Sequence, residues 1–128
     1  MAAKRSRISR SSDFQRIYRQ GTSTASRFLV LYSFKRLPGA SAEGPRLGLS
    51  VSKKLGGAVV RNRIKRLLRE AFRACAEQLT EEYDVVVIAR PQLLDLVARE
   101  SAGEKGAVGA ALRELLGRAG VLREADET

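Results

Sequence analysis

The sequence predicts an α+β fold: a single β-sheet with helices packed on one side. Three observations predict it. The 128 residues amount to one domain, and with 44% hydrophobic and 30% charged residues the composition is that of a soluble globular chain. Several short segments have the apolar patterns of strands. Others repeat apolar residues at helical spacing. The expected order is α-β-β-β-α-β-α, and a sheet covered by helices is the simplest layered arrangement for it.

The chain is expected to begin with a flexible basic arm over residues 1–10, followed by a helix over about 12–20. Ser12 and Gln15 have the spacing of a capping box. Three residues then share one helical face because they recur at i, i+3 and i+4. They are Phe14, Ile17 and Tyr18. The polar segment 22–26 is compatible with a short edge strand.

Three further strands are expected. Residues 28–34 are rich in β-branched and aromatic residues and are largely apolar on both faces, which predicts a central strand. A turn-rich loop, 37–45, separates them from 46–52, which alternate between apolar and small residues. We therefore expect 46–52 to pair with the preceding strand as a hairpin. The continuous apolar run at 84–89 predicts a buried strand.

The longest predicted helix covers about residues 58–79, because its apolar residues form one continuous arc. They are Val60, Ile64, Leu67, Leu68, Ala71, Phe72, Cys75 and Leu79. Cys75 is expected to be a buried thiol. The leucines at 93–96 suggest a helical turn, residues 108–118 suggest a second amphipathic helix, and 119–128 form an acidic tail that we expect to be frayed. The whole chain, 1–128, is expected to be one domain.

The charge of the chain is strongly segregated. The net charge is +10, but residues 1–73 hold 18 lysines and arginines against three acids, whereas 74–128 hold six against 11. Solubility alone needs no such segregation. A basic surface of this kind usually meets a polyanion, either nucleic acid or an anionic membrane, so the first half of the chain is expected to carry the polyanion-binding surface.

The composition also excludes several classes of protein. There is no histidine and only one cysteine, so the chain can form neither an internal disulfide nor a zinc cluster, and it lacks the commonest general base. Residues 1–73 contain no cluster of acids with metal-ligand spacing, which argues against a nuclease that works alone. No apolar run approaches the roughly 18 residues that span a bilayer, and no signal peptide is evident. We expect a cytoplasmic protein without a membrane partner.

The polar face of the long helix has the strongest functional signal. Glu70 is its only acid before Glu77, so the cations are not balanced as they are on most solvated helices. The polar face presents a row of mostly cationic side chains: Arg61, Asn62, Lys65, Arg66, Arg69 and Arg73. Arg63 lies beyond the edge of this row, and Lys53 and Lys54 extend it. Guanidinium groups pair bidentately with phosphate, and an asparagine can reach a base edge or a 2′-hydroxyl. The turn at 56–57 would add a helix N-terminus as a second anion site.

Five of the seven aromatic residues lie in the first helix and the first long strand. Phe28 and Phe34 are best explained as core residues, whereas Phe14, Tyr18 and Tyr32 could form a partly exposed aromatic floor. An aromatic floor beside a basic rim is typical of surfaces that stack single-stranded nucleotides.

Together these segments closely resemble the bacterial ribonuclease P protein subunit. The resemblance rests on residues 48–57, Gly-Leu-Ser-Val-Ser-Lys-Lys-Leu-Gly-Gly, and on 59–72, where the Arg-Asn-Arg at 61–63 is the hallmark of the family. Residues 12–23 resemble its first helix and 84–90 its last strand. The match runs from about residue 7 to about 118.

The resemblance implies the same order of elements, with a left-handed crossover between parallel strands around the basic helix, against the usual right-handed rule. It implies a small protein partner of a large catalytic RNA. That complex removes the 5′ leader of precursor tRNA by Mg²⁺-dependent hydrolysis. The RNA would hold the Mg²⁺, the protein alone would be inactive, and no further protein partner would be required.

The resemblance also implies two sets of contact residues. Those expected to bind the RNA subunit are Arg61, Asn62, Arg63, Lys65, Arg66 and Arg69, with Lys53 and Lys54 as the extension of the patch. Those expected to line the cleft for the leader are Phe14, Tyr18, Tyr32, Ser52 and Lys53.

Two other classes of function remain open at this point. A ribosomal protein or RNA chaperone would share the charge and the fold, and a nuclease acting without RNA would share the charge. A binder of double-stranded DNA is disfavoured, because the basic helix packs one face on a sheet and has no helix-turn-helix partner.

Overall fold

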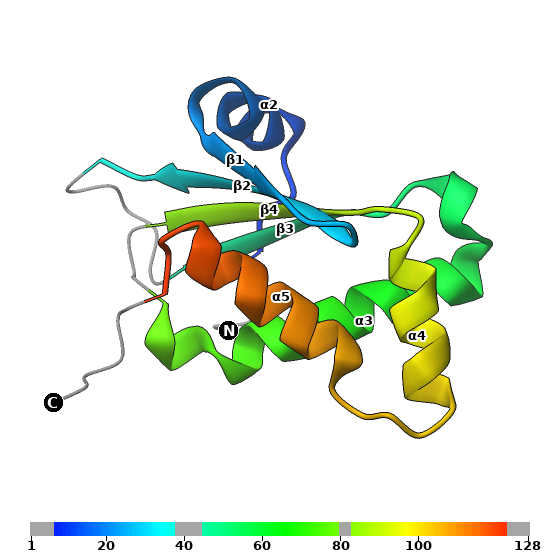
Figure 1. Cartoon of the computed structure of the whole chain (residues 1–128). Helices are drawn as coiled ribbons and strands as arrows, with labels where there is room; N and C mark the ends of the chain where they lie inside the picture. Colours follow the sequence, from blue (N-terminus) through cyan, green and yellow to red (C-terminus); the bar gives the residue numbers. More distant parts are fainter. Residues whose placement is uncertain (1–6, 38–44, 80–82, 123–128) are drawn as a thin grey trace, which may run out of the picture.

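The computed structural model describes residues 7–37, 45–79 and 83–122. The predicted α+β class and the order of elements are confirmed, with one additional helix, α4 (Figure 1). The strands in these ranges are β1 (Thr22–Ala25), β2 (Leu29–Lys35), β3 (Arg46–Ser50) and β4 (Tyr83–Ala89). The α-helices in the same ranges are α2 (Ser11–Gln20), α3 (Ala58–Ala74), α4 (Leu93–Ser101) and α5 (Ala107–Arg118). None of these helices is long and apolar enough to cross a bilayer.

The strands form one mixed sheet in the order β1-β2-β4-β3. β2 pairs antiparallel with both β1 and β4, whereas β3 pairs parallel with β4. The predicted hairpin between 28–34 and 46–52 is therefore wrong. β4 separates these segments because its side chains are apolar on both faces and are best buried in the centre of the sheet. The parallel pair is connected through α3, and the left hand of this crossover stays a prediction.

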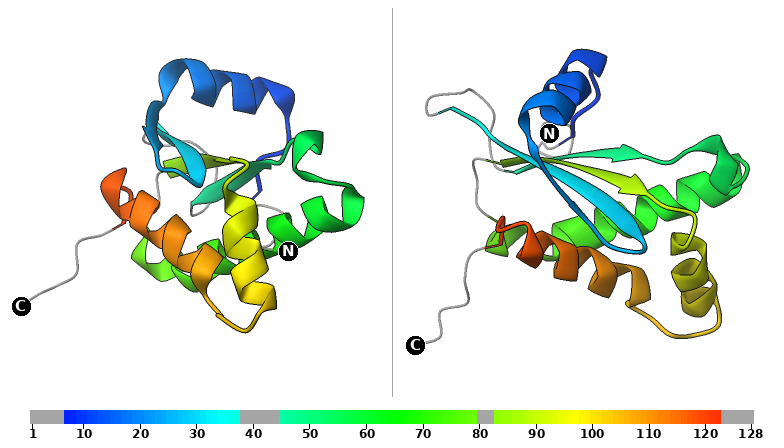
Figure 2. Two further views of the ribbon diagram at one scale, coloured as in Figure 1. Left: turned by 45° about the vertical axis from the view of Figure 1, so that its right-hand side comes forward. Right: turned by 45° about the horizontal axis from the view of Figure 1, so that its top comes forward.

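Helices cover both faces of the sheet, so the prediction of helices on one side is wrong. Figure 2 shows α2 on one face and α3, α4 and α5 on the other. The larger core lies beneath the last three helices and includes Leu29, Leu31 and Val87. A smaller cluster joins Ile8 and Ile17 to Val86 on the opposite face. A second cluster forms because β2 and β4 are apolar on both sides and α2 has an apolar face of its own.

The packed region is wider than the sequence predicted. Ile8, placed in the flexible arm, is buried, and its N–H donates to the carbonyl of Leu47 at 2.9 Å. Val121, placed in the frayed tail, is also buried, and Leu122 forms a bridge with Leu79. Both short segments pack because they place apolar side chains against the core. Residues 1–6 of the predicted arm, 38–44 of the predicted loop and 123–128 of the predicted tail lie outside the described residues.

Several helix boundaries differ from the predicted ones. α2 begins at Ser11, and the residue at its N-cap, Arg10, makes no side-chain cap, so the predicted capping box is wrong. Asp13 instead pairs with Arg16 at 2.9 Å. The long helix ends at Ala74 and is followed by a short 3-10 turn, Ala76–Gln78. The predicted helical turn at 93–96 opens the nine-residue helix α4.

The predicted burial of Cys75 is confirmed, and burial raises the pKa of its thiol.

Gly21 joins α2 to β1 at a point of close backbone approach. A Cβ atom there would lie 2.6 Å from the carbonyl oxygens of Ile17 and Ser33. We expect Gly21→Ala to lower the free energy of unfolding by about 1–3 kcal/mol, because the backbone must shift to relieve the clash. Gly117→Ala in α5 is the control, since a Cβ atom there would meet nothing closer than the Leu122 side chain at 3.7 Å. Urea denaturation of the two variants tests this, and equal stabilities would contradict it.

One buried ionic cluster connects β3, β4 and the end of β2. The Asp84 carboxylate is fully buried and accepts hydrogen bonds from Arg46 Nε at 2.9 Å and Nη2 at 2.7 Å. Arg36 Nη1 donates to the same carboxylate at 2.6 Å. Burial raises the pKa of Asp84, but these hydrogen bonds and charges outweigh it, so the pKa is lowered overall. Because Arg46 and Asp84 are register partners, the ion pair holds β3 beside β4.

Candidate nucleic-acid interface

The predicted aromatic residues come together where α2 crosses the sheet. The ring centres of Phe14 and Tyr18 lie 6.2 Å apart, and Tyr18 meets Tyr32 of β2 edge to face at 5.0 Å. Phe14 lies directly on Gly48 of β3, where a Cβ atom would come within 2.9 Å of its ring. A glycine is needed there because any side chain would displace the ring. We call Phe14, Tyr18 and Tyr32 the aromatic surface.

The aromatic surface continues onto a part of the sheet that α2 leaves partly exposed. Val86 is fully buried beneath α2, whereas Val30, Ile88 and Ser50 on the same face are only half-buried. Val30 and Ser50 are both register partners of Ile88, which places the three side by side. Sequence reasoning missed these residues. The alternation of β3 could have identified Ser50, because it lies two residues before the predicted Ser52.

Tyr18 is the most exposed member of the aromatic surface, at 37%. Partial burial and the neighbouring Tyr32 raise the pKa of its phenol, while a hydrogen bond with the Ser50 hydroxyl lowers it in part. The phenol is therefore neutral at physiological pH. A neutral, partly exposed ring can stack on a base without repelling the phosphate next to it.

Ser52 and the two lysines follow β3 at the same end of the sheet. The Ser52 hydroxyl accepts the N–H of Lys54 at 3.1 Å and so caps a short 3-10 turn, Lys53–Leu55. Ser52, Lys53 and Lys54 are all exposed. This turn connects the sheet to the start of α3, where Gly56 has a φ of 149°, a conformation that favours glycine.

The basic helix α3 places its predicted residues on two flanks rather than in one row. Ile64, Leu68 and Phe72 face the core. Lys65 and Arg69 lie on one flank, half-buried. Arg63 lies on the other, where its Nη2 donates to Ser101 Oγ of α4 at 3.1 Å. Asn62, Arg66 and Arg73 are exposed between the flanks.

Two arginines of the Arg-Asn-Arg motif also make contacts within the chain. Arg61 Nε donates to the carbonyl of Gly56 at 3.2 Å, which closes the turn before α3. Arg63 connects α3 to α4 through this hydrogen bond to Ser101, and within the described residues its buried Nε has no hydrogen-bond partner. Both side chains are therefore held in position, while Asn62 between them is free to reach outward. Preorganised cations lose less entropy when they bind phosphate.

The flank of Lys65 and Arg69 also receives a residue that sequence reasoning did not single out. Partial burial and the charge of Arg7 lower the pKa of Arg69. Arg7 comes close because its segment bridges to Leu47 on the edge strand β3. Within the described residues, no carboxylate forms an ion pair with a cation of α3. We call Arg61, Asn62, Arg63, Lys65, Arg66 and Arg69 the basic surface.

Comparisons with known proteins agree in sequence and in structure. The family model described as Ribonuclease P matches residues 2–115. The ribonuclease P protein component of Clostridium novyi is 39% identical over 118 residues, which cover 92% of this chain and 96% of that protein.

Solved structures of ribonuclease P proteins share the fold. The protein from Staphylococcus aureus superimposes with a TM-score of 0.77 at 37% identity, covering 92% of this chain and 98% of that one. The protein from Thermotoga maritima gives a TM-score of 0.70 at 32% identity, covering 83% and 92%. These matches confirm the resemblance that the sequence showed. The chain belongs to the ribonuclease P family, whose bacterial members are protein subunits of that ribonuclease.

Proposed function

We propose that this subunit binds the RNA subunit of ribonuclease P through its basic surface and holds the 5′ leader of precursor tRNA on its aromatic surface. The RNA subunit then performs the Mg²⁺-dependent cleavage that releases the leader, and it holds most of the Mg²⁺. The family assignment favours this function over a ribosomal protein or an RNA chaperone. That the complex works in the cytoplasm and needs no further protein stays a prediction of the family resemblance.

The observation that carries the proposal is the unbalanced charge of α3. Its cations have no acid partners among the described residues, so a polyanion is the partner that best relieves their mutual repulsion. The described residues contain no group of three histidine, cysteine, aspartate or glutamate side chains that could hold a metal ion. The groups on this face are suited to binding and positioning RNA.

We expect the protein without RNA to leave precursor tRNA uncleaved in Mg²⁺, and cleavage to appear when the RNA subunit from the same source is added. The measurement is 5′-end formation on a labelled precursor tRNA. Cleavage that persists after the protein is freed of RNA, and that a single substitution on the basic surface abolishes, would overturn the assignment of catalysis to the RNA.

The aromatic surface should matter only for substrates that have a leader long enough to reach it. Stacking on an aromatic ring is worth about 1–3 kcal/mol per base, so Tyr32→Ala should weaken binding of a precursor with a long leader at least fivefold. Binding of mature tRNA should be unchanged. The test is the dissociation constant of each RNA from the reconstituted complex, and an equal loss for both would contradict a leader contact.

A further inference from the structure

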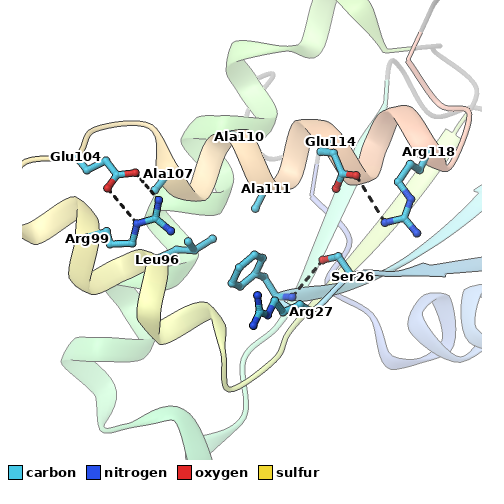
Figure 3. A pocket seen from close by; sticks show the side chains of 11 residues that line it. Ser26, Arg27, Leu96, Arg99, Glu104, Ala107, Ala110, Ala111, Glu114 and Arg118 are labelled. Carbon is cyan, nitrogen blue, oxygen red and sulfur yellow. Dashed lines mark hydrogen bonds and ion pairs between the residues drawn. The ribbon is translucent and has the colours of Figure 1, made fainter.

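A cavity of about 530 Å³ lies on the face of the sheet opposite the aromatic surface. It is formed between the β1–β2 turn and the helices α4 and α5 (Figure 3). Neither the basic surface nor the aromatic surface includes any of its residues. Its volume lies within the range of pockets that take small molecules or single nucleotides.

The floor of this cavity is apolar, and one wall is aromatic. Leu96 of α4 and three alanines of α5, Ala107, Ala110 and Ala111, form the floor, where small side chains leave the space open. Phe28 contributes the aromatic wall. Strict alternation along a strand would place Phe28 on the same face as Tyr32, but Phe28 packs against the core on the helix side, in agreement with its expected role as a core residue. The Ser26 hydroxyl accepts the N–H groups of Phe28 and Leu29 and so forms a turn. Phe28 belongs to this turn and not to β2, which begins at Leu29, so it does not follow the in–out alternation of the strand.

The rim of the cavity is charged, and within the described residues one cation on it forms no ion pair. Arg99 donates two hydrogen bonds to Glu104, at 3.0 and 2.6 Å, so its charge is neutralised. Arg118 lies 3.8 Å from Glu114 and donates to the carbonyl of Ala25 at 3.2 Å.

Arg27 differs from these two arginines. It is exposed and forms no ion pair within the described part of the chain, and its guanidinium carbon lies 5.7 Å from the centre of the Phe28 ring. The cavity thus combines an aromatic wall with one available guanidinium. This pair of groups suits a ligand that has both a flat ring and a negative charge. An unpaired nucleotide has both, since bases stack on aromatic rings and on guanidinium planes while the phosphate pairs with arginine.

The position of the cavity connects it to the aromatic surface. Val30 is half-buried on the sheet face that carries the aromatic surface, and it is the register partner of Ala25. Arg27 lies in the turn between these two residues. The N–H of Arg90, at the end of β4, donates to the carbonyl of Phe28 at 3.0 Å. A strand of RNA that crosses the sheet past Val30 would therefore reach this turn next and then the cavity beyond it.

We propose that this cavity binds one unpaired nucleotide of the precursor tRNA leader, beyond the nucleotides that lie on the aromatic surface. The base enters between Phe28 and the alanines of α5, and Arg27 pairs with the phosphate. The inference rests on the proposed function, because it extends the path of the leader from one face of the sheet to the other.

The test compares precursor tRNAs with a short leader of about two nucleotides and a long one of about ten, a length within the usual site size for single strands. Two variants alter the cavity: Arg27→Gln removes the free cation, and Ala111→Leu fills the space. Their matched controls are Lys105→Gln and Ala98→Leu, exposed positions on the same side that do not line the cavity. We expect both cavity variants to weaken binding of the long leader to the reconstituted complex about tenfold and to leave the short leader unchanged. The controls should match the parent.

The Tyr32→Ala variant, measured alongside, separates the two proposals. If it weakens binding of the long leader while both cavity variants bind like the parent, the cavity proposal is wrong and the proposed function stands. If Tyr32→Ala and both cavity variants all bind like the parent, both are wrong. Equal weakening of both leaders by Arg27→Gln would also overturn the cavity proposal, because it would indicate a contact with the RNA subunit or with the body of the tRNA. If Arg27→Gln weakens binding of the long leader but Ala111→Leu binds it like the parent, with unchanged thermal unfolding, insertion of a base into the cavity is excluded.

Discussion

Asp84→Asn is expected to cause the largest loss of stability of any single substitution considered in this protein, about 3–5 kcal/mol. The carboxylate is fully buried and is shared by Arg36 and Arg46. Asparagine keeps the shape of the side chain but not its charge, so Arg36, itself 9% exposed, is left buried beside a neutral group. Chemical denaturation measures the effect. Asp95→Asn, on the exposed side of α4, is the control and should change stability by no more than about 0.5 kcal/mol.

The same substitution has a defined pH dependence. The pKa of Asp84 in the folded protein is lower than the ordinary value of 3.8. Its contribution to stability is therefore complete above about pH 3.8 and is lost as the pH falls through the lower pKa of the folded state. The stability difference between the parent and Asp84→Asn should accordingly shrink below pH 4 and stay constant from there to neutral pH. A difference that is already small at neutral pH would show that the ion cluster does not stabilise the fold.

Binding to the RNA subunit is expected to weaken steeply with salt. Six to eight phosphate contacts imply a slope of about −4 to −7 in a plot of log affinity against log salt concentration. A fourfold rise in salt would then lower the affinity roughly 250- to 16,000-fold. A slope near zero would mean that the basic surface is not the contact with RNA.

Variants of α3 identify which flank carries this salt dependence. Lys65→Gln combined with Arg69→Gln should bring the slope about two units closer to zero, because each removed phosphate contact accounts for about one unit. Lys105→Gln, in the loop after α4, should leave the slope unchanged. Arg63→Ala should change the slope by about one unit and also lower stability, since Arg63 bonds to Ser101. Unchanged stability in Arg63→Ala would show that this hydrogen bond contributes nothing to the fold.

The sequence alone determined the elements and the kind of partner. Periodicity located α3 and α5, because their apolar residues repeat at a spacing that only a helix can bury on one side, whereas β2 and β4 were located as short runs that are largely apolar on both faces. The segregated charge indicated a polyanion, the resemblance around the Arg-Asn-Arg motif indicated an RNA partner, and the comparisons agree with the family that this motif suggested. These features are local, so they can be read without knowing which segments meet in space. The capping box at Ser12 failed for the opposite reason: a local motif competes with tertiary contacts, and here the helix begins one residue earlier.

Only the tertiary structure decided which strands are neighbours, which face each helix covers and which cations are free. Pairing of β3 with β4 rather than β2 depends on burying the most apolar strand in the centre, which is a property of the whole sheet. α2 crosses the second face because Phe14 fits over Gly48, a contact between residues 34 positions apart. The sequence does not show that Arg63 is bonded to Ser101, or that Arg27 lies beside a cavity and forms no ion pair within the described residues. Long-range packing sets the strand order, the face that each helix covers and the contacts of each arginine. The residue pattern within one segment does not encode such packing.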